Sequence, residues 1–328
     1  MHPRSRRTLA LWALLWVSGP TLATGEDAAV ALVARMAEAT RTLNYDGVFV
    51  YQRGNQTDTF RIIHSRDERG GERERLISLS GAAREIIRDS EKVTCIDPED
   101  QSVMVEKSQP RNLFPGLTRP TEEVAKHYRF VQTGRDRIAG RPAEVVEIRP
   151  RSAYRYGYRF WIDAGNHMLL RSDVVNSHGV SLEQIMFTQI SHPDRIAEDL
   201  LVQDIPAATS PAAPAAVKSR AAAADETMEA WRVAWVPDGF ALRDRQMEQL
   251  SASQVPAERF VYSDGLATVS VFVERLMDGE VPMQGFATRG AVTAFSSVAD
   301  AHQITVIGEV PPLTLKQIAM SVEPAESR

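Results

Sequence analysis

Short runs of alternating apolar and polar residues, separated by turn residues, follow one another through most of residues 45–188. Such alternation predicts half-buried β-strands. Between residues 45 and 106 no helix-length segment separates neighbouring runs, so we expect antiparallel pairing, because parallel pairs need long crossover connections. The expected strands are 45–52, 59–65, 75–80, 84–89, 92–96, 102–106, 143–148, 154–163, 168–175 and 180–188, with one more at Phe130. A large, mostly antiparallel sheet of this kind can curl around an apolar cavity.

Two segments of the same region predict helices. Residues 26–43 have apolar side chains at steps of three and four, and two acids at the N-terminal end, where the helix dipole favours negative charge. Residues 121–128 predict a short helix with Thr121 as N-cap, after an irregular stretch at 110–120. The apolar face expected of the first helix consists of Val30, Val33, Met36, Ala37, Thr40 and Leu43.

The composition changes at residues 207–224, which contain only Ala, Pro, Ser, Thr, Val, Lys and Arg. A segment without aromatic residues or apolar periodicity is typical of a surface linker. We therefore predict a signal peptide at 1–23, a sheet domain at 24–206, an Ala/Pro-rich linker at 207–225 and a smaller α+β domain at 226–328. In the last domain we expect strands at 259–262, 267–273, 289–296 and 304–310, and a helix at 314–322.

The first residues predict export. Arg4, Arg6 and Arg7 precede an uncharged run at 9–17, and small residues at 21–23 fit a signal peptidase site. The run has about half of the ~20 residues that a membrane-spanning helix needs. We therefore expect a cleaved signal peptide rather than a short N-terminal anchor, and no membrane anchor in the mature protein.

Charge and cysteine content narrow the class of protein. The formal net charge is −5, and it becomes about −8 without residues 1–23, which include three arginines and no acid. An acidic chain argues against nucleic acid as the partner. Cys95 is the only cysteine, so it cannot form an internal disulfide. We favour a small buried side chain over a redox thiol.

Signatures of catalysis are missing from the sequence. It contains no G-x-S-x-G elbow, no P-loop, no dinucleotide glycine fingerprint and no H-E-x-x-H pair. We therefore expect no enzyme activity, no metal and no cofactor. Two carboxylates that are distant in sequence could still form a hydrolase site, so a hydrolase stays a third hypothesis.

Two segments invite a functional interpretation. Residues 66–75 (RDERGGERER) are either a contact loop for an acidic partner or, as we favour, a solvated hairpin connection. Residues 154–163 place tyrosines on one face of the expected strand, where they either line a ligand cavity or belong to the core. The arginines between them suit lipid phosphates. The candidate ligand-binding residues are Tyr154, Arg155, Tyr156, Tyr158 and Arg159.

Long stretches of both domains resemble the RseB/MucB family. They are LNYDGVFVY (43–51), YRYGYRFWID (154–163), LLRSD (169–173), WRVAWVPDGF (231–240), RFVYSDGLATVSVFVE (259–274) and VIGEVPPLTLKQIAMSV (306–322). The resemblance spans nearly the whole mature chain. It implies an α+β fold: a first domain similar to the lipoprotein carriers LolA and LolB, which are incomplete antiparallel β-barrels with helices over the opening, and a smaller α+β second domain.

The resemblance also implies a regulatory role in the bacterial periplasm. Members of this family bind the periplasmic domain of a membrane-spanning anti-sigma factor and shield it from the site-1 protease. Lipopolysaccharide or a related lipid displaces them, and the envelope-stress sigma factor is then released. The oligomeric state, a homo-oligomer included, stays open. The alternative is a periplasmic lipid or lipoprotein carrier, although LolA-like carriers have one domain.

Overall fold

A computed structural model of the chain describes residues 25–67, 70–89, 92–97, 102–107, 121–202, 231–248, 255–277 and 279–325. The predicted signal peptide, the irregular stretch at 110–120 and the linker at 207–225 lie outside these residues.

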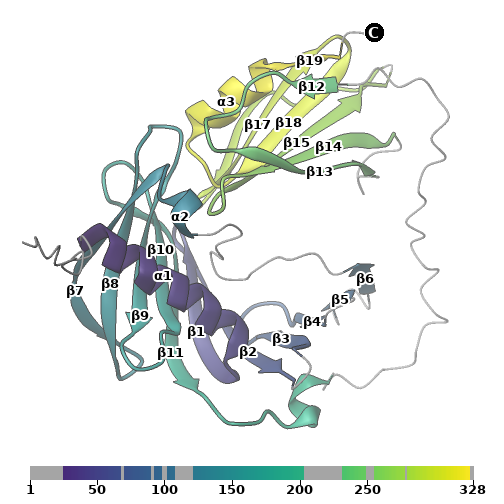
Figure 1. The fold of residues 1–328 in the computed structure, drawn as a ribbon. Coiled ribbons are helices and arrows are strands. Elements are labelled where there is room, and N and C mark those ends of the chain that lie inside the picture. The colour runs from purple at the N-terminus through teal and green to yellow at the C-terminus, as the bar shows by residue number, and fades with distance from the viewer. Residues whose placement is uncertain are drawn as a thin grey trace, which may run out of the picture.

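An antiparallel sheet of 11 strands forms the first half of the molecule (Figure 1). The order is β6-β5-β4-β3-β2-β1-β11-β10-β9-β8-β7, with β1 against β11 in the middle. Because β6 and β7 stand at opposite ends of this order, the sheet is open in the described part of the chain. The prediction of a large antiparallel sheet that is not closed into a barrel is confirmed. The strands are β1 (Tyr45–Arg53), β2 (Gln56–Arg66), β3 (Glu72–Ser78), β4 (Glu85–Arg88), β5 (Lys92–Asp97), β6 (Ser102–Lys107), β7 (Tyr128–Ile138), β8 (Arg141–Pro150), β9 (Gly157–Asp163), β10 (Leu169–Val175) and β11 (Ser181–Ser191).

The helix α1 (Gly25–Thr42) lies across the sheet and packs against β7 and β10 (Figure 1). The helix is confirmed, but its buried face is centred on other residues than predicted. Of the predicted face, Val33 and Met36 are fully buried, whereas Val30 and Ala37 are half-buried. The buried stripe consists of Ala29, Leu32, Val33, Met36 and Ala39, so it shares Val33 and Met36 with the predicted face, and Val30 and Leu43 pack at its margin.

Two further elements are shorter than the sequence predicts. The helix α2 (Thr121–Val124) ends four residues before β7 begins at Tyr128. The strand β9 begins at Gly157, so residues 154–156 form an irregular segment after β8 rather than the start of the strand. At Gly157 the chain passes close to β8, since an added Cβ would lie 3.2 Å from the carbonyl oxygen of Ile148.

The segment at residues 66–75 connects β2 to β3. Asp67 closes the turn, because its backbone oxygen accepts from the N–H of Gly70 at 3.0 Å and its Oδ1 from the N–H of Gly71 at 2.8 Å. The favoured hairpin is confirmed, but full solvation is wrong for Arg75. Its guanidinium is buried and pairs with Glu85 at 2.5 Å. Cys95 lies in β5 with a half-buried side chain.

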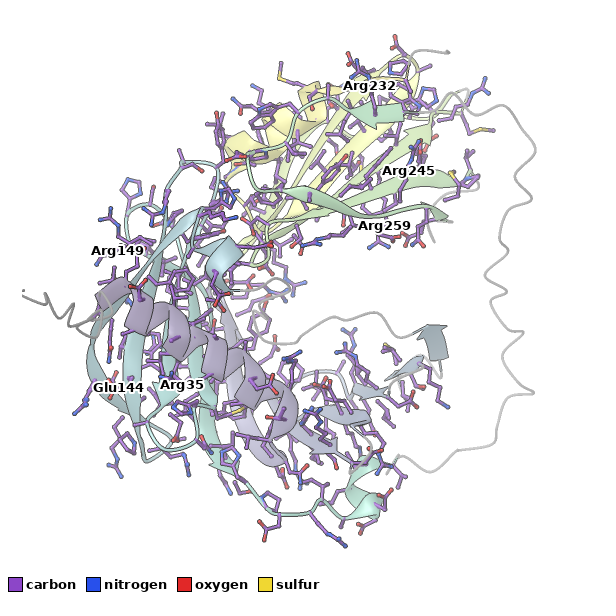
Figure 2. The ribbon with its side chains drawn as sticks, viewed as in Figure 1. Arg35, Glu144, Arg149, Arg232, Arg245 and Arg259 are labelled. Atoms are coloured by element: carbon purple, nitrogen blue, oxygen red, sulfur yellow. The ribbon has the colours of Figure 1, made fainter. Side chains whose placement is uncertain are left out.

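The second half of the molecule contains an antiparallel sheet of six strands with the order β13-β14-β15-β18-β17-β16. The helix α3 (Pro312–Met320) packs against β17 and β18, and β12 pairs with β19. Arg245 pairs with Glu258 and Arg259 with Glu248, and both pairs join β13 to β14 (Figure 2). The remaining elements are η1 (Glu198–Leu201), which precedes this half, and β12 (Trp231–Val233), β13 (Ala241–Glu248), β14 (Ala257–Ser263), β15 (Thr268–Arg275), β16 (Gly285–Arg289), β17 (Val292–Ala299), β18 (His302–Gly308) and β19 (Val322–Pro324).

The inner strands of this sheet agree with the prediction, but the two outer strands, β13 and β16, were missed. Both lie at an edge of the sheet. All five residues of β16 are exposed, so no buried face imposes the apolar alternation by which a strand is recognised. No helix in the described part of the chain has the length and apolar character needed to cross a bilayer.

Candidate functional site

The two halves meet in a buried contact. Leu266, in the connection between β14 and β15, and Ala291, between β16 and β17, belong to the apolar core of the first sheet. Two turns of the second half are therefore inserted into the first. A contact of this kind fixes how the halves are oriented, because apolar surface would be returned to water if they separated.

A buried ion pair lies at the centre of one side of this contact. Arg155 Nε donates to Asp264 Oδ2 at 2.7 Å, and the two side chains are 3% and 0% exposed. The guanidinium also donates to the backbone oxygen of Asp238 and lies over the rings of Phe240 and Tyr128, at 5.0 and 5.8 Å from their centroids. Two segments of the second half, the connection from β12 to β13 and the turn from β14 to β15, thus converge with β7 of the first on one side chain.

The carboxylate of Asp264 is positioned by its own turn. Its Oδ1 accepts the N–H groups of Leu266 at 3.0 Å and Ala267 at 2.9 Å, which is the usual role of aspartate in a tight turn. Its Oδ2 accepts from Tyr128 Oη at 2.9 Å and from Arg155. Burial, and then the charge of Asp264, raise the pKa of Tyr128 well above its ordinary value. The hydroxyl therefore keeps its proton and remains a donor.

Glu183 on β11 forms the other side of the contact. Its Oε2 accepts from Tyr51 Oη at 2.8 Å, and its Oε1 accepts from the backbone N–H of Ala291 at 3.1 Å. Gly290, with φ +65°, allows this approach, because an added Cβ would collide with Glu183 and with Arg53. Burial, and then the charge of Glu183, raise the pKa of Tyr51 above its ordinary value.

The structure brings two of the five predicted ligand-binding residues to this contact directly. Besides Arg155, the ring of Tyr154 meets that of Trp235 edge to face with centroids 5.2 Å apart, and its backbone oxygen accepts from Thr314 Oγ1 at 3.0 Å. Both residues lie in the irregular segment before β9, and both contact the second half of the molecule.

The other three predicted residues are placed differently. Tyr156 and Tyr158 are buried in the core of the first sheet, and Tyr158 Oη has no hydrogen-bond partner among the described residues. Arg159 pairs with Glu147 at 3.0 Å and lies 5.9 Å from the centroid of the Trp161 ring. Ligand binding by these five residues stays a prediction.

Asp264, Asp238 and Glu183 were not predicted as functional residues. The sequence marks Asp264 as part of a Ser-Asp-Gly turn, but no spacing rule pairs that turn with an arginine 109 positions away. Only the contact between the halves reveals the pairing.

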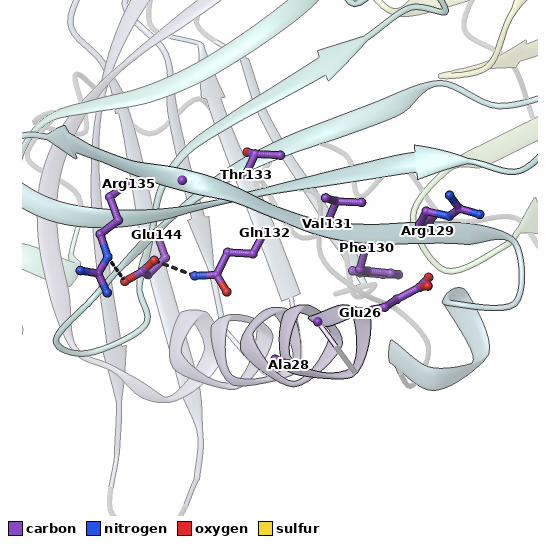
Figure 3. Close-up of a pocket in the computed structure, with 11 residues that line it drawn as sticks. Glu26, Ala28, Arg129, Phe130, Val131, Gln132, Thr133, Arg135 and Glu144 are labelled. Atoms are coloured by element: carbon purple, nitrogen blue, oxygen red, sulfur yellow. Dashed lines mark hydrogen bonds and ion pairs between the residues drawn. The ribbon is translucent and has the colours of Figure 1, made fainter. Parts of the chain in front are cut away.

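A groove of about 870 Å³ opens elsewhere, between the first turn of α1 and β7 (Figure 3). Among the residues that line it, Glu144 accepts from Arg135 at 2.8 Å and from Gln132 at 2.7 Å. None of the five predicted residues lines this groove. Within the described ranges, no three His, Cys, Asp or Glu side chains are grouped so that they could hold a metal ion.

Comparison with known proteins gives matches over both halves. Residues 28–205 match the MucB/RseB N-terminal domain and residues 225–323 the MucB/RseB C-terminal domain. The sigma factor AlgU regulatory protein MucB of Pseudomonas aeruginosa is 32% identical over 97% of this chain and 98% of its own.

Solved structures agree. The crystal structure of MucB in complex with MucA(peri) matches 91% of this chain and 100% of its own, with 30% identity and a TM-score of 0.71. The complex of Pseudomonas aeruginosa MucA and MucB matches 92% of this chain and 100% of its own, with 29% identity and a TM-score of 0.74. Because both halves match in order and a relative more than 30% identical spans nearly the whole chain, the protein belongs to the MucB/RseB family.

Proposed function

We propose that this protein is a periplasmic regulatory binding protein and not an enzyme. It binds the periplasmic part of a membrane-spanning anti-sigma factor, shields that part from site-1 proteolysis and is released by lipid or lipopolysaccharide. In this way it negatively regulates the envelope-stress sigma factor. The observation that carries the proposal is the match of both halves to MucB, whose solved complexes contain MucA.

The contact between the halves supports a partner that meets both of them. The Arg155–Asp264 pair and the inserted residues Leu266 and Ala291 hold the halves in one relative position. A rigid arrangement lowers the entropy cost of binding an extended segment across both, because the orientation is fixed beforehand.

Exposed apolar side chains at one edge of the second sheet offer a surface for such a segment. Val281, Met283 and Phe286 are each more than half exposed and lie within six residues of one another, next to and on the edge strand β16. Scattered exposed apolar residues are ordinary, but a group of them beside an edge strand is typical of an interaction surface.

A cleavage assay tests the proposal. The mature chain is mixed with the periplasmic segment of the anti-sigma factor encoded in the same genome and with the site-1 protease, and the rate of cleavage is measured. We expect the rate to fall as the chain is added, and to recover when lipopolysaccharide is added. Equal rates with and without the chain would refute shielding.

Two matched substitutions test the surface. Val281→Asp places a charge at a side chain that is 87% exposed on the apolar edge, and Val180→Asp does the same at one that is 57% exposed in the first half. We expect Val281→Asp to weaken shielding and Val180→Asp to leave it unchanged. If both variants shield like the parent chain, the segment binds elsewhere, although shielding itself still stands.

A further inference from the structure

The groove beside α1 runs along the free edge of β7 (Figure 3). β7 is the last strand of the first sheet, and β8 is the only strand of the described chain that pairs with it. Residues 129–135 of β7 all line the groove, one after another. Because the side chains of a strand alternate between its two faces, a cavity against one face would be lined by every second residue. The groove therefore follows the edge, where a strand presents backbone N–H and C=O groups.

The opposite wall of the groove leaves room for an extended segment. It is formed by the first turn of α1, with the exposed small residues Gly25 and Ala28 and the half-buried Glu26. Residues 129–135 span roughly 20 Å, because an antiparallel strand rises about 3.4 Å per residue. An exposed strand edge is a recurring place for an extended peptide to add itself to a sheet.

The charges along β7 favour an acidic segment. The strand contains three arginines, Arg129, Arg135 and Arg137, and one acid, Asp136, which gives it a formal net charge of +2. Arg135 pairs with Glu144. In the part of the chain that the structure describes, no ion pair joins Arg129 or Arg137 to a carboxylate, and both side chains are exposed.

We propose that this edge is a docking site for an acidic polypeptide segment, which pairs with β7 as a further strand of the first sheet. Backbone hydrogen bonds hold the segment, and Arg129 and Arg137 select carboxylate side chains. The site lies in the first half of the molecule, so it is separate from the apolar surface at residues 281–286 of the second.

A second copy of the chain does not suit this edge. If two copies of β7 paired antiparallel about Thr133, Arg129 of each would lie opposite Arg137 of the other, and like charges directly opposite each other destabilise a sheet. The register shift between Gln132 and Gly134 also interrupts the long, flat pairing that two such strands would need, whereas a flexible segment can follow the bend.

Two synthetic peptides of about eight residues, long enough to span the groove, test the charge preference. In one peptide glutamate alternates with threonine and valine, and in the other lysine replaces each glutamate. Fluorescence anisotropy measures the binding of each peptide to the mature chain. We expect the acidic peptide to bind about tenfold more tightly than the lysine peptide. Equal affinities, or no binding of the acidic peptide at about 1 mM, would overturn the proposal.

N-methylation of the acidic peptide tests strand pairing. Only alternate N–H groups of an added strand face β7. Methyl groups on one alternate set of peptide nitrogens should therefore abolish binding, and methyl groups on the other set should leave it nearly unchanged. Equal effects of the two sets would exclude strand addition.

Two charge reversals locate the site. Arg129→Glu changes the groove, and Arg243→Glu changes an exposed arginine on β13, an edge strand of the second sheet. We expect Arg129→Glu to weaken binding of the acidic peptide about tenfold and Arg243→Glu to leave it unchanged. Equal effects of the two reversals would overturn the site. If light scattering shows a dimer of the mature chain that the acidic peptide dissociates, a second copy occupies the edge and the proposal is wrong. If Arg129→Glu fails to fold by circular dichroism, the two methylated peptides decide on the parent chain.

Discussion

Replacing Asp264 by Asn should destabilise the protein more than any single exposed charge change. Asparagine keeps an Oδ1 that can accept the N–H groups of Leu266 and Ala267, so the turn is retained. Asparagine lacks the negative charge, and its NH2 group, which is a donor, would face two other donors, Arg155 Nε and Tyr128 Oη. An unpaired guanidinium is then left in a site where the side chain is 3% exposed.

The expected loss is about 3–5 kcal/mol of the free energy of unfolding, which is the usual cost of removing one partner of a buried pair. A double variant with Arg155→Met removes the stranded charge, so its loss should be smaller than the sum of the two single losses by at least ~1 kcal/mol. This non-additivity separates an uncompensated charge from a simple loss of packing.

The assay is urea unfolding of the mature chain at neutral pH, followed by circular dichroism. Glu38→Gln serves as the control, because it removes one partner of the exposed Arg41–Glu38 pair and should have no measurable effect. A loss below about 1 kcal/mol for Asp264→Asn, or strictly additive losses in the cycle, would refute the reasoning.

Two other measurements address the contact and the first sheet. Gly290→Ala should lower the free energy of unfolding by about 1–3 kcal/mol, since an added Cβ collides with Arg53 and Glu183 and the residue has a positive φ. The control Gly279→Ala, also at positive φ but in open space, should lose only the smaller free energy that comes from backbone strain. Equal melting temperatures for the two variants would count against the collision. Burial lowers the pKa of His64 below 6.5, so the stability it contributes is present above that pH and declines as the pH falls below it. An NMR titration that gives His64 a pKa of 6.5 or more would contradict this.

Local sequence patterns were sufficient to predict most strands of the first sheet and the inner strands of the second. Strands such as β1 and β15 bury alternate side chains, and apolar residues recur at the same spacing in their sequences. The edge strand β16 pairs with β17 but buries none of its residues, so its sequence shows no apolar alternation from which the strand could be predicted. The stripe of α1 that faces the sheet also depended on the surface it packs against, which shifted it from the predicted one.

The candidate ligand-binding residues were also predicted only in part. Alternation pointed to residues 154–163, but it described them as one strand with an aromatic face. In the structure the strand begins at Gly157, and Tyr154 and Arg155 contact the second half. Their partners Trp235 and Asp264 are about 80 and 110 residues away, beyond any pattern of local spacing.

The sequence by itself determined the antiparallel sheets, the main helices and, through long shared stretches, the family. These follow from short-range periodicity and from residue identity. The tertiary structure decided how the halves meet, since a charge such as Arg155 can be buried only where a carboxylate from a distant turn compensates it.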